Sequence, residues 1–260
     1  MTIFLCEDSM EGILSGVFAV YESRLPLEEC RLEMESEYEP RFFCEYRHVP
    51  SDCEKARRVE KKICTAMSEE AYFRLYRASM GKNPNRADHI FRFIILGLKY
   101  GKKVLRMLQE PAVYEIFQID RNVGNEAHLW KEFLRFERLQ NGIYYCKIGP
   151  ENRILELLIE HFSDRFPDMN WMIYDEMHRE AIMHASSGHV AMQREITDDD
   201  LQWIKSQQDA DCYTDMWQTF FHAIAIEERR NPRCQRNMLP IRYRKYMTEF
   251  QDSGVCRNKL

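Results

Sequence analysis

The segment Gly142–Ile148 (GIYYCKI) decides the fold class, because the hydrophobic pattern of the chain changes there from helical to extended. Before it, Asp88–Leu108 and roughly Pro111–Gln140 carry apolar residues at the spacing of a helix. The second of these helices is expected to be broken or kinked near Gly124. After Ile148 the chain contains short β-rich runs.

Three further runs of this kind are Trp171–Tyr174, Glu180–Ala185 and His189–Glu195. The last two flank Ser186–Gly188, a short turn of the type that joins hairpin strands. We therefore predict an α+β fold, with a small, mostly antiparallel sheet at about 142–195 surrounded by many helices.

The N-terminal part is predicted to contain strands and helices of its own. Thr2–Cys6 has the composition of a buried strand, and a helix extending to Tyr21 follows it. Glu28–Glu39 is acidic and irregular, and Phe42–Val49 is a further candidate strand. The loop at 81–85 is the best candidate boundary, which gives an N-terminal α/β segment at 1–82 and a second part at 83–260.

Composition excludes several classes of protein. The 260 residues are 45% hydrophobic and 12% aromatic, which is too much buryable surface for a disordered chain. The longest apolar stretch, Ile90–Tyr100, is interrupted by Arg92 and Lys99, whereas a membrane span needs about 20 apolar residues. Charged Glu7 and Asp8 argue against a signal peptide. We expect a soluble, cytoplasmic protein that does not bind membranes.

No metal or cofactor is predicted. The nine cysteines contain no CxxC pair, which favours reduced thiols over a disulfide framework. A cluster site would need a close ligand pair, which the four cysteines between 30 and 64 lack. Three histidines near the short strands would have to turn toward one point to bind a metal, and a turn separates the last two. They are His178, His184 and His189.

Positive charge is concentrated near the C-terminus. The chain has a net charge of −5, yet Arg229–Lys245 holds seven basic residues and no acid, so the other 243 residues carry −12. Such an array suits phosphate binding, with interleaved polar side chains adding contacts. Alternatively, it neutralises acidic faces of the protein itself, such as Glu28–Glu39 or Asp198–Asp200. The candidate nucleic-acid-binding residues here are Arg229, Asn231, Arg233, Arg236, Arg242, Tyr243 and Lys245.

A second basic stripe is formed by His128, Lys131 and Arg135, which recur at intervals of three and four residues on one helical face. Aromatic residues lie between them, as in an amphipathic helix. The stripe extends a phosphate-binding surface, or it is a solvated face above a buried aromatic one.

One acid could take part in catalysis. Asp175 comes directly after a predicted strand, where functional groups are common, and His128 could act with it as acid or base. No P-loop, GxGxxG, HExxH or GxSxG sequence is present.

Several spaced blocks resemble a bacterial domain of unknown function. They cover nearly the whole chain and are strongest from about 85 to 250. Leu239 replaces a common Met and Phe220-Phe221 replaces a Tyr pair, which removes two hydroxyls from that block. The blocks are Phe4–Gly12, His128–Phe136, Phe162–Phe166, Trp171–Asp175, Trp217–Ile226, Arg229–Arg233 and Arg236–Tyr243.

Proteins with this domain are described as DNA metabolism or DNA repair proteins, and the domain also occurs fused to uracil-DNA glycosylases. Stand-alone members resembling this chain are encoded beside a radical-SAM protein of DNA modification and repair. The resemblance implies DNA and that protein as partners, but it supplies no reaction.

Three functions follow as hypotheses. The first is a DNA-binding accessory protein that grips phosphates without reading sequence. The second is an enzyme acting on nucleic acid or a damaged base, with His128 and Asp175 as acid and base. The third is an interaction module that docks on an acidic partner through its arginines.

Overall fold

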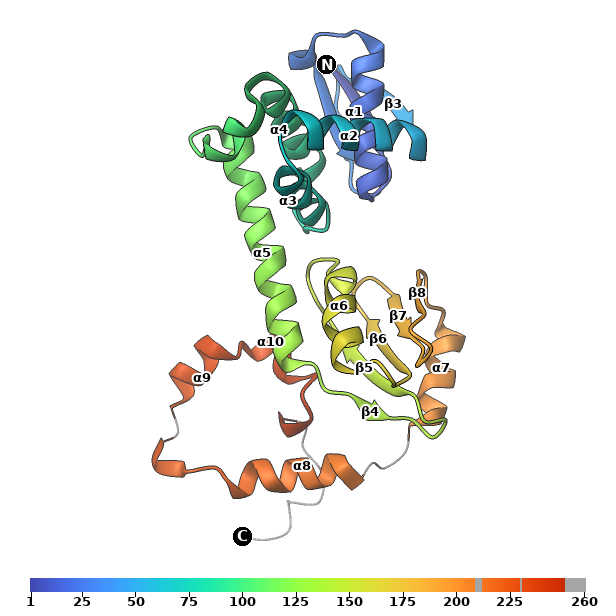
Figure 1. The fold of residues 1–260 in the computed structure, drawn as a ribbon, viewed down its shortest axis with the longest axis vertical. Helices are drawn as coiled ribbons and strands as arrows, with labels where there is room; N and C mark the ends of the chain where they lie inside the picture. The colour runs from blue at the N-terminus through green and yellow to red at the C-terminus, as the bar shows by residue number, and fades with distance from the viewer. Residues whose placement is uncertain (209–211, 230, 251–260) are drawn as a thin grey trace. The chain divides into compact units, whose positions relative to one another are not determined.

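The structure is a computed structural model that describes residues 1–208, 212–229 and 231–250. The chain divides into two compact units, Met1–Glu126 and Ala127–Leu260, and each is described by itself (Figure 1). The boundary predicted at residues 82 and 83 falls instead within the N-terminal unit, just before its fourth helix.

The N-terminal unit contains a sheet of three parallel strands in the order β2-β1-β3. These are β1 (Thr2–Cys6), β2 (Cys30–Met34) and β3 (Glu45–Val49). Every residue of the central strand β1 is buried, which confirms the strand predicted from its continuous apolar run. The helix α1 (Met10–Ser23) follows, and Ser9 caps its first turn.

The strand β2 lies where the sequence predicted an irregular acidic segment, so that prediction was wrong. Cys30, Leu32 and Met34 are buried apolar residues at every second position. The alternating charges hid this pattern, because buried Glu33 is held by Arg31 at 2.9 Å and by Arg41 at 3.0 Å. A paired carboxylate can be buried in a strand where an unpaired one could not.

Four further helices complete this unit, and the last of them extends into the second unit. The break predicted near Gly124 was wrong, because the last helix is continuous through that residue. The helices are α2 (Cys53–Ala66), α3 (Glu69–Ser79), α4 (Arg86–Tyr100) and α5 (Pro111–Phe133), with a 3-10 helix at Gly101–Arg106.

A five-stranded sheet forms the centre of the C-terminal unit, in the order β4-β5-β6-β7-β8. Only the pair β5–β6 is parallel, and the other three pairs are antiparallel. The predicted α+β class is therefore confirmed. The strands are β4 (Glu137–Arg138), β5 (Tyr144–Ile148), β6 (Trp171–Asp175), β7 (Glu180–His184) and β8 (Val190–Gln193).

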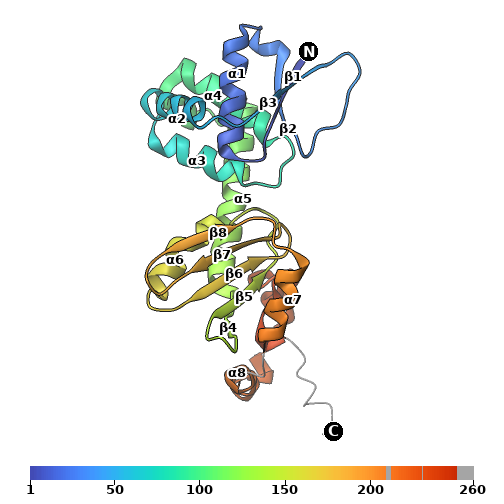
Figure 2. The same cartoon turned by 90° about the vertical axis from the view of Figure 1, so that its right-hand side faces the viewer.

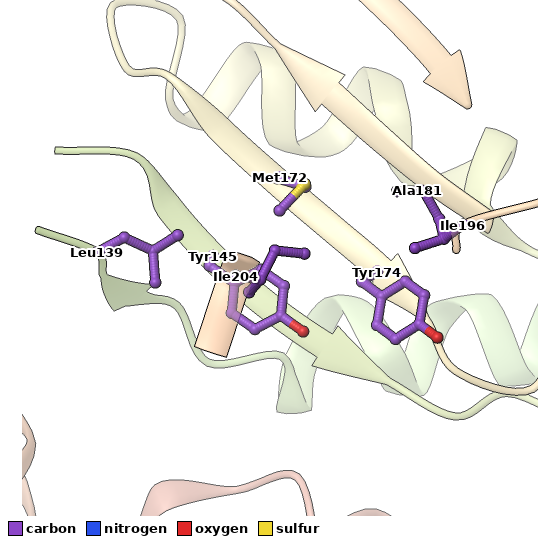
Figure 3. Packing of buried hydrophobic residues seen from close by; sticks show 7 residues of the cluster. All are labelled: Leu139, Tyr145, Met172, Tyr174, Ala181, Ile196 and Ile204. Atoms are coloured by element: carbon purple, nitrogen blue, oxygen red, sulfur yellow. The ribbon is translucent and has the colours of Figure 1, made fainter. Parts of the chain in front are cut away.

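Helices cover both faces of this sheet, α6 (Leu155–Arg165) on one side and α7 (Asp198–Gln207) on the other (Figure 2). Side chains alternate between the faces along β6. Trp171 packs against Phe162 of α6, with ring centroids 6.3 Å apart. Met172 and Tyr174 belong to the opposite cluster around Ile204 of α7 (Figure 3).

Short helices follow α7, and the last of them packs on the end of α5. Tyr243 is fully buried, with its ring 4.8 Å from that of Trp130. Within the described part of the chain, no helix is both long and apolar enough to cross a membrane. The elements are α8 (Cys212–Ala223), α9 (Pro232–Met238) and α10 (Ile241–Arg244), with 3-10 helices at Glu227–Arg229 and Thr248–Phe250.

Candidate nucleic-acid interface

A cleft of about 940 Å³ opens in the C-terminal unit between the end of α5, helix α6 and the first residues of β5 and β6. Cationic and aromatic side chains dominate its lining, and Glu132 is the only acid among them. The basic or titratable groups are His128, Lys131, Arg135, His161 and Arg165, and the aromatic groups are Phe136, Tyr144, Phe162, Phe166 and Trp171.

Two helices supply the cations. His128 and Lys131 lie one turn apart on α5, as their spacing predicted, and Arg135 follows just beyond its end. His161 and Arg165 lie one turn apart on α6. The sequence analysis did not select this second pair, although its i, i+4 spacing on a predicted helix was visible.

The aromatic side chains hold one another in fixed positions. Phe136 meets Phe162 edge to face at 5.5 Å, and Phe162 stacks with Phe166 at 6.4 Å between ring centroids. Trp171 stacks on His184 at 4.9 Å, and its indole N–H has no hydrogen-bond partner among the described residues. The rings therefore form a preorganised apolar wall that contains one unsatisfied donor.

The cations of the cleft differ in availability. Arg135 binds the carboxylate of buried Glu249 at 2.9 Å and also donates to two backbone carbonyls. His128 pairs with Glu132 at 3.1 Å. Lys131 and Arg165 have no acidic partner within the described ranges, so they are the cations best placed to bind an external anion.

The electrostatic field of the cleft acts on His161. Burial lowers the pKa of this imidazole below its ordinary value of 6.5, and the nearby charges of Lys131 and Arg165 lower it further. Asp164 acts in the opposite direction but does not outweigh them. The cleft thus disfavours an additional positive charge when it is empty, as expected where cations converge.

The first half of the basic segment projects from its backbone. Arg229, Arg233 and Arg236 are all exposed. Asn231 uses its side chain to cap α9, accepting a hydrogen bond from the Cys234 amide at 3.0 Å. This cap positions α9 rather than leaving the amide for a ligand.

The second half of the basic segment is bound to the protein itself. Arg242 pairs with Glu151 at 2.5 Å and lies over the Tyr243 ring. Lys245 donates to Glu176 at 2.9 Å. Neutralisation of the protein's own acids therefore applies to this half, although the acids differ from the two runs considered from the sequence.

Asp175 lies apart from the cleft of His128, because it is not among the residues that line it. Its side chain is fully buried and closes the turn between β6 and β7. One oxygen accepts from the amides of Met177 and His178, and the other lies 2.6 Å from Nδ1 of His178. The two candidate acid–base residues are thus not brought together.

Among the described residues, no group of three or more His, Cys, Asp or Glu side chains could hold a metal ion. His178 is engaged with Asp175, and Nδ1 of His184 lies 2.9 Å from the carbonyl of Met169.

The C-terminal unit is thus an α/β layered unit with a cleft of cations and aromatic rings. The family described as "Domain of unknown function (DUF4130)" matches residues 84–249, which is more than half of the chain, and the chain belongs to this family. The match contains every residue of the cleft. No match was found among curated proteins.

Proposed function

We propose that this protein binds DNA through the cleft at α5 and α6, as an accessory protein of DNA repair or modification. The observation that carries the proposal is the convergence of unpaired cations and fixed aromatic rings in one cleft. Cations supply the phosphate contacts and rings supply stacking for bases, which is how single-stranded nucleic acid is bound without sequence preference.

Phosphate binding is assigned to Lys131 and Arg165, because neither is neutralised within the described chain. Arg229, Arg233 and Arg236 add exposed positive charge on the same unit. The resemblance to DNA repair proteins supports DNA as the ligand, and the acidic remainder of the chain repels it from other surfaces.

Replacing Lys131 and Arg165 together by alanine should weaken binding of a single-stranded oligonucleotide about tenfold at low salt. It should also reduce the slope of log affinity against log salt by about 2, one for each lost phosphate contact. Fluorescence anisotropy across a salt series measures both quantities.

The matched control is Arg57→Ala with Lys61→Ala, which removes the same charge from exposed positions on α2. An equal loss in both double variants would show a general charge effect and contradict the assignment to the cleft. Wild-type affinity that does not change with salt would contradict DNA binding through phosphates altogether.

Binding should also strengthen as the pH falls. A phosphate beside His161 favours the protonated ring, so binding raises the pKa that the empty cleft holds below 6.5. Complex formation then takes up a proton, and affinity rises as the pH falls through the bound-state pKa and levels off below the free-state pKa. A shift of about half a pKa unit corresponds to about a threefold change in affinity.

His161→Gln should flatten this profile between pH 8 and pH 5.5. His128 also titrates in this window and pairs with Glu132, so His128→Gln is the control. A profile that His161→Gln leaves unchanged would place the protonation elsewhere.

Docking on a partner protein is a second candidate function, and exposed apolar residues on and just after α8 favour it. Trp217 is 41% exposed, Phe220 53% and Ile224 58%, at helical spacing, and the exposed arginines follow closely. Apolar surface bordered by cations suits an acidic partner, for which the radical-SAM protein is our candidate. Its recovery with this protein after nuclease treatment would favour docking, whereas DNA-dependent recovery would favour the first function.

A further inference from the structure

A second pocket of cations and aromatic rings lies in the N-terminal unit. It has a volume of about 540 Å³ and is formed by α3, by α5 and by Leu108 between them. Its polar lining includes Arg74 and Arg77 from α3 with Asp120 and Arg121 from α5.

The charges of this pocket do not cancel. Asp120 is 3% exposed, and its two oxygens accept from Arg74 at 2.7 Å and from Arg77 at 2.6 Å. One carboxylate thus serves two guanidinium groups. Arg121 adds a third cation, and Asp120 is the only acid in the lining.

Two of these arginines have donors to spare. Arg77 reaches Asp120 through Nε, and its terminal nitrogens make no hydrogen bond within the described part of the chain. Arg121 is exposed and has no ion-pair partner in the same ranges. A phosphate group accepts hydrogen bonds from such guanidinium forks in preference to most other groups.

Aromatic rings flank the cations. Phe117 lies beneath Arg74, with the guanidinium carbon 4.4 Å from the ring centroid. Tyr114 lines the same pocket and is 48% exposed, so its ring is accessible to a ligand. A base can stack on such a ring while its phosphate meets the arginines.

We propose that this pocket is a second nucleotide-binding site, in which Arg77 and Arg121 hold a phosphate of single-stranded nucleic acid and Tyr114 stacks with its base. The inference rests on the proposed function for the class of ligand. It adds a separate site, so that each unit of the chain binds nucleotides.

Isothermal titration of the full chain with a thymidine tetranucleotide at low salt tests the proposal through its stoichiometry. The wild type should bind two strands per chain. Arg121→Ala should bind one, and so should the double variant Lys131→Ala with Arg165→Ala. The matched control is Arg106→Ala, an exposed arginine outside the pocket lining, which should still bind two.

The outcomes separate the two proposals. A single wild-type site that only the Lys131 and Arg165 substitutions remove would overturn the second site and leave the proposed function intact. A single site that only Arg121→Ala removes would overturn binding in the cleft and support the second site. Two sites that persist in Arg121→Ala, with an unchanged melting curve, would also overturn the inference.

Discussion

Replacing Arg86 by methionine should lower the free energy of unfolding of the N-terminal unit by about 3 kcal/mol. Arg86 begins α4 and is 3% exposed, which is rare for an arginine. Its guanidinium group binds Asp8 after β1 and both carboxylate oxygens of Glu37 after β2, the latter at 3.0 Å. It therefore connects the ends of two strands to the first turn of α4.

The expected loss is large because methionine keeps most of the apolar stem but leaves two carboxylates facing each other without a cation. Asp8 and Glu37 retain 17% and 35% of their side-chain exposure, so water offsets part of the cost. This places the estimate at the lower end of the values for a broken buried pair, at about 3 kcal/mol.

Hydrogen exchange of the β1 and α4 amides is the direct measurement, since all four tryptophans lie beyond residue 126 and report on the other unit. Arg57→Met, at an exposed position with no partner among the described residues, is the control. If exchange in β1 accelerates no more in Arg86→Met than in that control, the network does not stabilise the unit.

Gly149→Ala should destabilise the C-terminal unit by about 3 kcal/mol. A Cβ at this position would overlap the hydroxyl of Tyr246. That hydroxyl donates to Glu176, and the Tyr246 ring lies 5.2 Å from Trp130. Burial, followed by the hydrogen bond to Glu176, raises the pKa of Tyr246 to about 12, so the ring is a neutral donor at ordinary pH.

The substitution therefore displaces a whole side chain. The hydrogen bond to a charged acceptor contributes about 1.5–3 kcal/mol and the aromatic pair about 0.5–1.5 kcal/mol, and both are lost when the ring leaves. Trp130 precedes Lys131 on α5, so we also expect the cleft to change shape. Denaturant unfolding followed by tryptophan fluorescence reports this unit.

A double-mutant cycle isolates the cause. In a Tyr246→Ala background the clash no longer exists, so adding Gly149→Ala should cost close to nothing further. Tyr246→Phe should lose the hydrogen bond alone and fall between the two. An equal cost of Gly149→Ala in both backgrounds would show that the clash is not responsible.

Much of the architecture was predictable because its signals are local. The buried run of β1 and the short alternating strands from β5 to β8 each specify their own conformation over a few residues. The cations on α5 were likewise found from their spacing. Strand β2 was missed because charged residues stand between its apolar ones, and only pairing on the sheet makes their burial acceptable.

Part of the candidate site could not be predicted, because it depends on contacts between distant residues. His161 and Arg165 belong to the cleft only because α6 folds across the sheet toward the end of α5. The long range of these contacts carries no periodic signal in the sequence.

The sequence by itself determined the fold class, most helices and strands, and the concentration of positive charge between Arg229 and Lys245. The tertiary structure decided which of those charges remain available to a ligand. Lys245 meets Glu176 across 69 residues and Arg135 meets Glu249 across 114. Ion pairing depends on distance in space rather than along the chain, so the same basic composition yields internal salt bridges in one segment and exposed cations in another.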